Sequence, residues 1–365
     1  MFAMFSWDTW KIFLVVYSVL QLSKCDITIS THQLFIKLYE TETFNITVTD
    51  FNKSNIEVKF HNQYDDIVKT DPDIIYLDSG DQAFEINITA MGAGHSLLTA
   101  QATQDVNVND IYLTATIYKS KAIEVLSITF GWIYFLAWSL SFYPQIITNF
   151  KRKSVIGLDF DYMALNLVGY LSYTIFTLGL YYIPPVIEDY FNRYPRGLIP
   201  VTFNDNAFNI HGLAAIIFTI IQCVIYERGN QKISLVASII LGVIGFLYGV
   251  TIFLVIFQCI YWLDFLYFCS YVKLLITLLK YVPQAVLNYR RKSTEGWSIG
   301  GVFLDLAGGV FSILQMILDA HNYDDWVAIF GNASKFGLGL FSVLFQFIFV
   351  AQHYILYKPK NKDVY

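Results

Sequence analysis

Hydrophobic and polar residues are distributed unevenly along the chain. Beyond position 121, apolar stretches recur at close intervals, each near the roughly 20 residues that an α-helix needs to cross a bilayer. This pattern predicts seven membrane-spanning helices. We place them near residues 123–146, 158–182, 205–226, 234–257, 263–287, 298–319 and 332–356.

Residues 26–121 follow another pattern, in which apolar and polar positions alternate. The segments 44–49 and 111–117 are typical of strands, and Gly92-Ala93-Gly94 is typical of a turn. We therefore predict that a β-sandwich domain, loosely immunoglobulin-like in architecture, precedes the membrane helices.

N-glycosylation sequons cluster in this domain, at Asn45, Asn52 and Asn87. Sugar is added on the lumenal side of a membrane, so the cluster predicts a glycosylated lumenal domain. A fourth sequon, at Asn332, lies against a predicted membrane helix, and we expect it to be unused.

Residues 1–25 are typical of a signal peptide. Lys11 precedes an apolar run from Ile12 to Leu20 that is too short to span a bilayer, and small residues suited to cleavage follow at Ser23 and Cys25. An uncleaved anchor is the alternative. With cleavage after Cys25, no cysteine remains in the β-rich domain, which therefore has no disulfide framework.

Composition and charge agree with this division. The chain is 55% hydrophobic and only 15% charged, as in membrane proteins. Basic residues concentrate in alternate loops, whereas the other loops hold only Arg193 and Arg196. The positive-inside rule places the basic loops and the tail 358–365 in the cytosol. These loops and the tail contain Lys151-Arg152-Lys153, Arg228, Lys232, Arg290-Arg291-Lys292, Lys358, Lys360 and Lys362.

The membrane region contains an internal repeat. Tyr143-Pro144-Gln145 and Val282-Pro283-Gln284 each precede an asparagine, a basic loop with a serine, and an apolar helix. The offset from Pro144 to Pro283 equals the offset from Asn166 to Asp305, so the register is kept beyond the motif itself. Repeats of this kind form many carriers.

We assign three helices to each repeat, over 122–227 and 261–357, with a linker helix in 228–260. An odd linker helix lets two three-helix bundles run parallel. The predicted fold is an all-α membrane protein of seven helices, built as two parallel bundles behind the β-sandwich.

The Pro-Gln pairs have a mechanical interpretation. Pro144 and Pro283 each remove a backbone hydrogen bond and permit a kink, so we expect both to act as hinges. We expect Gln145 and Gln284 to bond the carbonyls that are freed, or a neighbouring helix.

Several ionisable residues lie inside predicted spans, where each costs roughly 2.5–3.5 kcal/mol at the bilayer centre and therefore suggests function. Structural alternatives remain for most of them. Lys280 can extend to the interface, His211 can be a packing residue, Asp205 can cap a helix, and Lys273 can pair with a neighbouring acid. Asp305 is the hardest to explain structurally, because Phe303, Leu304 and Leu306 surround it.

The presence of both positively and negatively charged residues inside the predicted spans favours a zwitterionic solute over a neutral sugar. Lysines hold carboxylates and aspartates hold ammonium groups or protons, while Trp138, Phe142 and Tyr281 can form walls or gates. No metal-spaced His/Cys cluster, phosphate-binding glycine loop or nucleophile elbow is found in the sequence, so we expect neither an enzyme nor a cofactor.

The two Pro-Gln loops resemble the PQ-loop transporter family. The stretches Lys151 to Leu158, Tyr226 to Gly229, Lys292 to Gly300 and Lys335 to Gly339 resemble its lysosomal cystine–proton symporters over about residues 120–357. The resemblance implies export of L-cystine from the lysosome lumen to the cytosol, driven by protons. As partners it implies cystine, protons and lysosomal membrane lipid, with proton-pump and nutrient-signalling complexes beyond them.

The resemblance also implies roles for individual residues. Asp305 is expected to carry the coupled proton, with Asp205 as a second protonatable site. The residues expected around the substrate are Asn166, Lys273, Asn288, Asp305 and Lys335, with Trp138, Phe142 and Gln145 nearby.

The chain departs from the family pattern at two places. Gly301 stands where an asparagine is often found, and the tail lacks the expected tyrosine-based sorting signal. Two alternatives stay open. One is a PQ-loop carrier for cationic amino acids or sugars, and the other is a seven-span nutrient-sensing receptor or scaffold.

Overall fold

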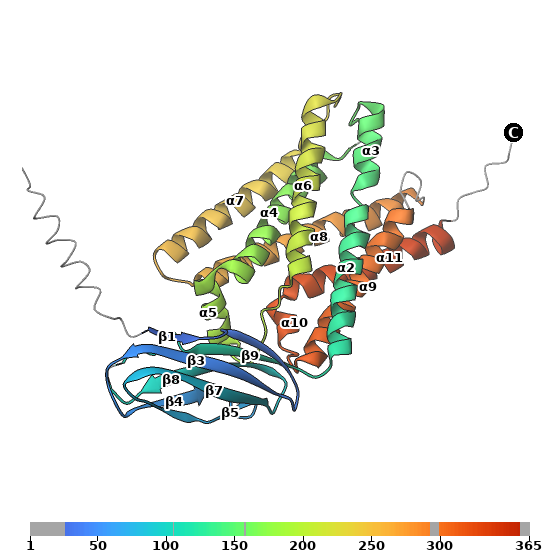
Figure 1. Cartoon of the computed structure of the whole chain (residues 1–365). Helices are drawn as coiled ribbons and strands as arrows, with labels where there is room; N and C mark the ends of the chain where they lie inside the picture. Colours follow the sequence, from blue (N-terminus) through green and yellow to red (C-terminus); the bar gives the residue numbers. More distant parts are fainter. Residues whose placement is uncertain (1–25, 105, 157, 293–298, 358–365) are drawn as a thin grey trace, which may run out of the picture. The chain divides into compact units, whose positions relative to one another are not determined.

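The computed structural model describes residues 26–104, 106–156, 158–292 and 299–357 (Figure 1). These residues form two compact units that divide after Lys119, close to the boundary expected from the sequence. The predicted signal peptide and cytosolic tail lie outside the described residues.

The first unit contains two β-sheets, with strand orders β1-β3-β7-β5 and β2-β9-β8-β4-β6. Only the β2–β9 pairing is parallel among the ladders of the described strands. The strands are β1 Asp26–Ile29, β2 Gln33–Lys37, β3 Thr41–Phe51, β4 Ile56–Asn62, β5 Val68–Asp71, β6 Ile74–Leu77, β7 Gly80–Ala90, β8 Gly94–Ala102 and β9 Tyr112–Tyr118.

Alternation along the strands produces the sandwich. On β3, Phe44, Ile46 and Val48 are buried, while the residues between them are exposed. They join one apolar core with residues such as Ile86 and Leu113 from both sheets. The predicted strands and the turn at Gly92-Ala93-Gly94 are confirmed.

Two of the three sequons of this unit lie on the first sheet, and the third, Asn52, follows the end of β3. Asn45 on β3 and Asn87 on β7 both point away from the core, because their neighbours along each strand are buried. Asn45 and Asn52 are exposed and Asn87 is half-buried. Glycosylation at these positions stays a prediction.

The second unit is helical (Figure 1). Seven of its helical stretches are long and apolar enough to cross a membrane, as predicted. The elements are α2 Lys121–Leu140, α3 Tyr143–Arg152, α4 Phe160–Tyr182, α5 Pro184–Arg193, α6 Phe203–Ile225, α7 Leu235–Ile256, α8 Trp262–Arg291, α9 Ile299–Asn322, α10 Ala328–Gly331, α11 Ala333–Ala351 and the π-helical turn η1 Gln352–Leu356.

The helices of the two repeats pack against one another. The first consists of α2 with α3, α4 and α6, and the second of α8, α9 and α11. The first helix of each repeat contacts the second helix of the other, since α2 packs on α9 and α4 packs on α8. The linker α7 is only 11% buried over its most apolar part, as expected for a helix that faces lipid.

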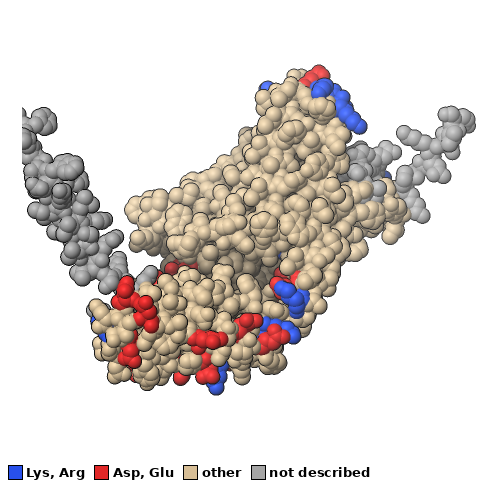
Figure 2. Space-filling model, in the orientation of Figure 1, with Lys and Arg blue, Asp and Glu red and all other residues tan. Residues whose placement is uncertain are grey.

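Lysine and arginine side chains gather at the end of the helical unit where α3 and α6 terminate (Figure 2). We call this the basic end, and we call the opposite end, where α4 leads into α5, the α5 end. In the view of Figure 2, the side of the unit between these ends shows mostly uncharged atoms. This distribution matches a membrane-embedded belt.

The two Pro-Gln sites differ in backbone. A break at Ser141 and Phe142 separates α2 from α3, and Pro144 is the second residue of α3. In contrast, α8 is helical from Trp262 to Arg291, through Pro283. A break therefore accompanies the first pair only, and a hinge at the second stays a prediction.

Candidate functional site

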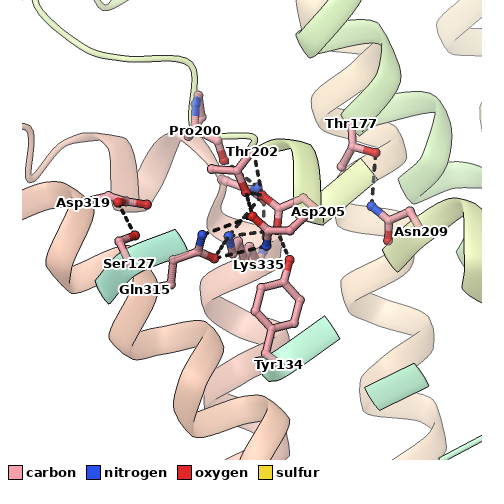
Figure 3. Close-up of polar contacts among 12 residues, drawn as sticks. Ser127, Tyr134, Thr177, Pro200, Thr202, Asp205, Asn209, Gln315, Asp319 and Lys335 are labelled. Atoms are coloured by element: carbon pink, nitrogen blue, oxygen red, sulfur yellow. Dashed lines mark hydrogen bonds and ion pairs between the residues drawn. The ribbon is translucent and has the colours of Figure 1, made fainter. Parts of the chain in front are cut away.

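A buried ion pair joins the two repeats near the α5 end (Figure 3). The Nζ atom of Lys335 on α11 lies 2.8 Å from Oδ1 and 3.0 Å from Oδ2 of Asp205 on α6. The side chains are 6% and 3% exposed, respectively. Charges this well buried persist only when they are paired and hydrogen-bonded.

The start of α6 holds the Asp205 carboxylate in place. Thr202 is the N-cap, and its backbone N and its Oγ1 each donate to Asp205 Oδ2 over 2.8 Å. Tyr134 on α2 donates its hydroxyl to Oδ1. The capping role considered from the sequence is thus present, as a capping box with Asp205 at the third helical position rather than at the N-cap.

The start of α11 holds Lys335 in a similar way. Asn332 is the N-cap, and its Oδ1 accepts from the backbone N of Lys335 over 3.0 Å. The ammonium also donates to Gln315 Oε1 on α9 over 2.9 Å. Gln315 in turn bonds Asn204 on α6. Four helices, α2, α6, α9 and α11, therefore meet at this pair.

Asn332, which belongs to the fourth sequon, is fully buried. Its Nδ2 donates to the carbonyl of Pro200 over 2.9 Å, and its Oδ1 also accepts from the hydroxyl of Tyr173. The nitrogen that would carry a glycan is therefore engaged within the fold.

Another acid, Asp319 on α9, accepts a hydrogen bond from the hydroxyl of Ser127 on α2. Sequence reasoning did not single out Asp319. The feature that could have identified it is an acid in the last turn of a mostly apolar helix.

Asp305 lies on α9, nearer the basic end. Its Oδ2 accepts from Gln346 Nε2 over 3.4 Å, and its backbone carbonyl accepts from Ser342 Oγ over 2.8 Å. The indole of Trp138 donates to the same carbonyl over 3.2 Å. Asn166, the equivalent residue in the first repeat, is buried on α4, and its Nδ2 has no hydrogen-bond partner among the described residues.

Lys273 is also buried, at 5% exposure, on α8. Its ammonium lies 3.5 Å from the centroid of the Tyr170 ring, a cation–π contact with α4. The Phe142 ring packs edge-on against the same tyrosine.

His211, considered as a packing residue, contacts Phe142 and shares a 2.9 Å hydrogen bond with the Tyr143 hydroxyl. The side chain of Lys280 lies outside the described residues.

Each repeat contains the same cluster of side-chain amides. In the first repeat, Gln145 donates to Asn149 over 2.8 Å, Asn149 donates to Gln222 over 3.0 Å, and Gln222 donates to the carbonyl of Ile146 over 3.0 Å. The glutamine of the Pro-Gln pair thus bonds an asparagine one turn onward. The expectation that it bonds a freed carbonyl or a neighbouring helix is wrong.

The second repeat reproduces this cluster, with each hydrogen bond at 3.0 Å. Gln284 donates to Asn288, Asn288 to Gln352, and Gln352 to the carbonyl of Ala285. Asn288, expected near the substrate, is 3% exposed and is bonded within this cluster. Gln222 and Gln352 were missed from the sequence, although each is an amide near the end of a predicted membrane span.

A small cavity lies beside the ion pair. Its volume is about 10 Å³, room for about one water molecule and far too little for an amino acid. Of the predicted site residues it brings together Asp205, Lys335 and Trp138, while Asn166, Lys273, Asn288 and Asp305 do not line it. The lining residues are Tyr134, Trp138, Tyr173, Asp205, Phe208, Asn209, Lys335 and Leu338.

The arrangement is suited to binding a solute that carries both charges, and it is closed as it stands. Among the residues described here, no three His, Cys, Asp or Glu side chains converge as ligands for a metal. The buried acids and lysines of the helical unit instead contact one another, hydroxyls, amides and aromatic rings.

Comparison with known proteins places these observations in a family. The PQ loop repeat matches at residues 126–186 and 265–325. A Drosophila melanogaster protein named cystinosin is 46% identical, over 92% of this chain and 86% of its own length. The Bos taurus cystinosin is 36% identical over 96% and 97%.

A Saccharomyces cerevisiae protein named cystine transporter is 31% identical, over 64% of this chain and 95% of its own length. The similarity to the animal proteins extends through nearly the whole chain. The chain contains the PQ loop repeat and belongs to the cystinosin family.

Proposed function

We propose that this protein carries L-cystine out of the lysosome lumen into the cytosol, together with protons, by alternating access. The observation that carries the proposal is the buried Asp205–Lys335 pair, which lines a closed cavity between the two repeats. The names of the relatives, cystinosin and cystine transporter, supply the substrate.

Cystine suits these side chains chemically. Each of its two ends has an ammonium and a carboxylate, and the buried part of the helical unit offers Lys273 and Lys335 for the carboxylates. Asp205 and Asp305 serve as partners for ammonium groups or protons. The amide of Asn166, with a donor that is unused among the described residues, adds a hydrogen bond.

The proton step follows from the ion pair. In the acidic lumen, protonation of Asp205 removes its charge and weakens its hold on Lys335, which becomes available to a substrate carboxylate. Asp305 takes up the coupled proton deeper in the unit, beside Gln346, and releases it to the neutral cytosol. The α5 end then faces the lumen and the basic end faces the cytosol.

Orientation and location have separate support. The basic loops favour the cytosol, and the sequons at Asn45, Asn52 and Asn87 favour a lumenal β unit. Glycosidase treatment should reduce the apparent mass through these sites. A tag after Tyr365 and a tag within 26–121 should report opposite compartments; the same compartment for both would refute the seven-span topology.

Transport is tested with the protein redirected to the cell surface, so that the lumenal side faces the medium. Labelled cystine should enter faster from acidic than from neutral medium, with an inward proton current. Equal uptake at both pH values would refute proton coupling. Strong competition by glucose or by cationic amino acids would favour the other carrier classes.

Asp305→Asn tests the proton carrier. The amide retains the size of the acid but cannot ionise, so we expect normal folding and sorting with loss of the cystine-dependent current. Exchange of cystine for cystine should survive. A normal, pH-dependent current in this variant would make Asp305 structural and Asp205 the leading proton carrier.

A further inference from the structure

Asn209 lies on α6 one turn beyond Asp205, on the same face of the helix. It is fully buried. Its Nδ2 donates to Thr177 Oγ1 on α4 over 3.1 Å (Figure 3). Its backbone carbonyl accepts from the Thr174 hydroxyl. The contact with α4 fixes the orientation of the amide.

The other polar atom of this amide, Oδ1, has no hydrogen-bond partner among the described residues. Asn209 lines the cavity beside the ion pair, and its Nδ2 is already turned toward Thr177. A buried acceptor without a donor carries an uncompensated desolvation cost. This acceptor therefore stands ready, next to an acid and a lysine, for an N–H or O–H group that enters the cavity.

We propose that Asn209 Oδ1 and Asp205 together form the subsite for the ammonium group of the transported amino acid. The inference rests on the proposed function. When the ion pair separates, Lys335 binds the carboxylate of the substrate while Asp205 and Asn209 bind its ammonium. While Asp205 is ionised, a zwitterionic end of the substrate thus replaces each partner of the pair with a group of the same charge, and no charge is left unpaired.

An amide suits this position better than a second acid. A carboxyl group accepts an ammonium as an anion only while it is ionised. The amide oxygen does not titrate in this range, so Asn209 remains an acceptor in both protonation states of its neighbour. Recognition of the ammonium can then persist through the proton step.

The test compares cystine with dithiodipropionic acid, which has the same disulfide and carboxylates but no ammonium groups. Asn209→Leu keeps a similar volume and removes the acceptor. We expect the KM for cystine to rise about 10-fold or more, the loss of one hydrogen bond to a charged group, with the maximal rate much less changed. Inhibition by dithiodipropionic acid should be unchanged, so the preference for cystine over it falls by the same factor.

A matched control is available on the same helix. Asn206 is as buried as Asn209 and also has side-chain atoms without a partner among the described residues, but it does not line the cavity. Asn206→Leu should leave the preference unchanged. Asn209→Asp, which keeps an oxygen acceptor, should retain cystine affinity.

If Asn209→Leu weakens the binding of cystine and of dithiodipropionic acid by the same factor, Asn209 has a structural role and the inference is overturned. No change in the binding of either compound would also overturn it. If Asn209→Leu does not fold, Asn209→Ala is measured with the same outcomes. Failure of the unaltered protein to move cystine would instead refute the proposed function, so the two failures are distinguishable.

Discussion

Asp205 and Lys335 occupy equivalent places in the two repeats. Their separation along the sequence equals the separation between Thr202 and Asn332, the N-caps of their helices. Each is the third residue of its helix. One position in the repeat has thus acquired opposite charges in the two copies, and the fold brings them within 2.8 Å.

This pairing predicts non-additive effects of mutation. Lys335→Met leaves the Asp205 carboxylate buried without a cation, so it should destabilise the protein by about 3–5 kcal/mol at neutral pH. The double variant with Asp205→Asn removes both charges and should recover much of that loss. Thermal unfolding in detergent compares the unaltered protein, the two single variants and the double variant. Additive losses of stability would contradict a coupled pair.

A second prediction concerns Gly308 on α9. A β-carbon there would lie 2.4 Å from Cδ1 and Nε1 of the Trp138 ring, which lines the cavity. Gly308→Ala should displace this ring and reduce cystine transport at least ~10-fold while the protein still reaches the membrane, since a small misplacement at a site costs this much or more.

Trp138→Leu in the same chain should restore part of the transport, because the smaller side chain makes room. Gly242 on α7 is the control, since nothing lies within 4 Å of a β-carbon added there. Gly242→Ala should be neutral. Loss of transport in the control, or no effect of Gly308→Ala, would remove the steric explanation.

The amide clusters lead to a third prediction. Gln352→Leu leaves the Asn288 amide and the Ala285 carbonyl without their partner, so it should destabilise the protein by about 1–3 kcal/mol. Gln222→Leu should have a similar effect in the first repeat. Val224→Leu, at a position that is 77% exposed, serves as the control. Unfolding temperatures equal to that of the control would show that the clusters contribute nothing.

The fourth prediction concerns pH and the β unit. Burial lowers the pKa of His95 from 6.5 to about 4. The unfolded chain therefore takes up a proton near pH 6.5 while the folded one does not, so stability falls as the pH drops from 6.5 toward 4. The loss at pH 5 amounts to about 2 kcal/mol.

His95→Gln should flatten this dependence of stability on pH, measured on the full chain by limited proteolysis of the β unit. His61 on β4 is exposed and provides the control, since His61→Gln should leave the slope unchanged. A slope in His95→Gln equal to that of the unaltered protein would exclude His95 as the titrating group.

Much of the fold follows from the sequence, because the signals are local. The alternation of apolar and polar residues predicted strands in the β unit, and long apolar stretches predicted the membrane helices. The repeat was visible from Pro144 and Pro283 because the same offset also relates the helices that follow, α4 and α9.

The constant offset of the repeat does not extend to the third helix of each copy, α6 and α11. Gln222 and Gln352 are closer together in the sequence than the two prolines are, and the difference falls between α4 and α6, where α5 lies. Loops tolerate such length changes while packed helices keep their contacts. A fixed offset therefore could not reveal that Asp205 and Lys335 are equivalent, nor that they meet.

The two Pro-Gln sites mark another limit of the sequence. Their motifs match, yet a break separates α2 from α3 while α8 is helical through Pro283. A proline sets which backbone bond is missing, but packing decides whether the helix bends there. The difference between the repeats is a property of the folded bundle.

Because Asn332 is buried in the folded protein, a glycan on this residue would show that the chain had not folded correctly. Its side chain caps α11 and bonds Pro200, so a sugar on its nitrogen and this arrangement exclude each other. Only a chain in which α11 has not yet docked can be modified there. A molecule with sugar at Asn332 has therefore lost the cap that positions Lys335, and its added mass would identify a misassembled carrier without any assay of transport.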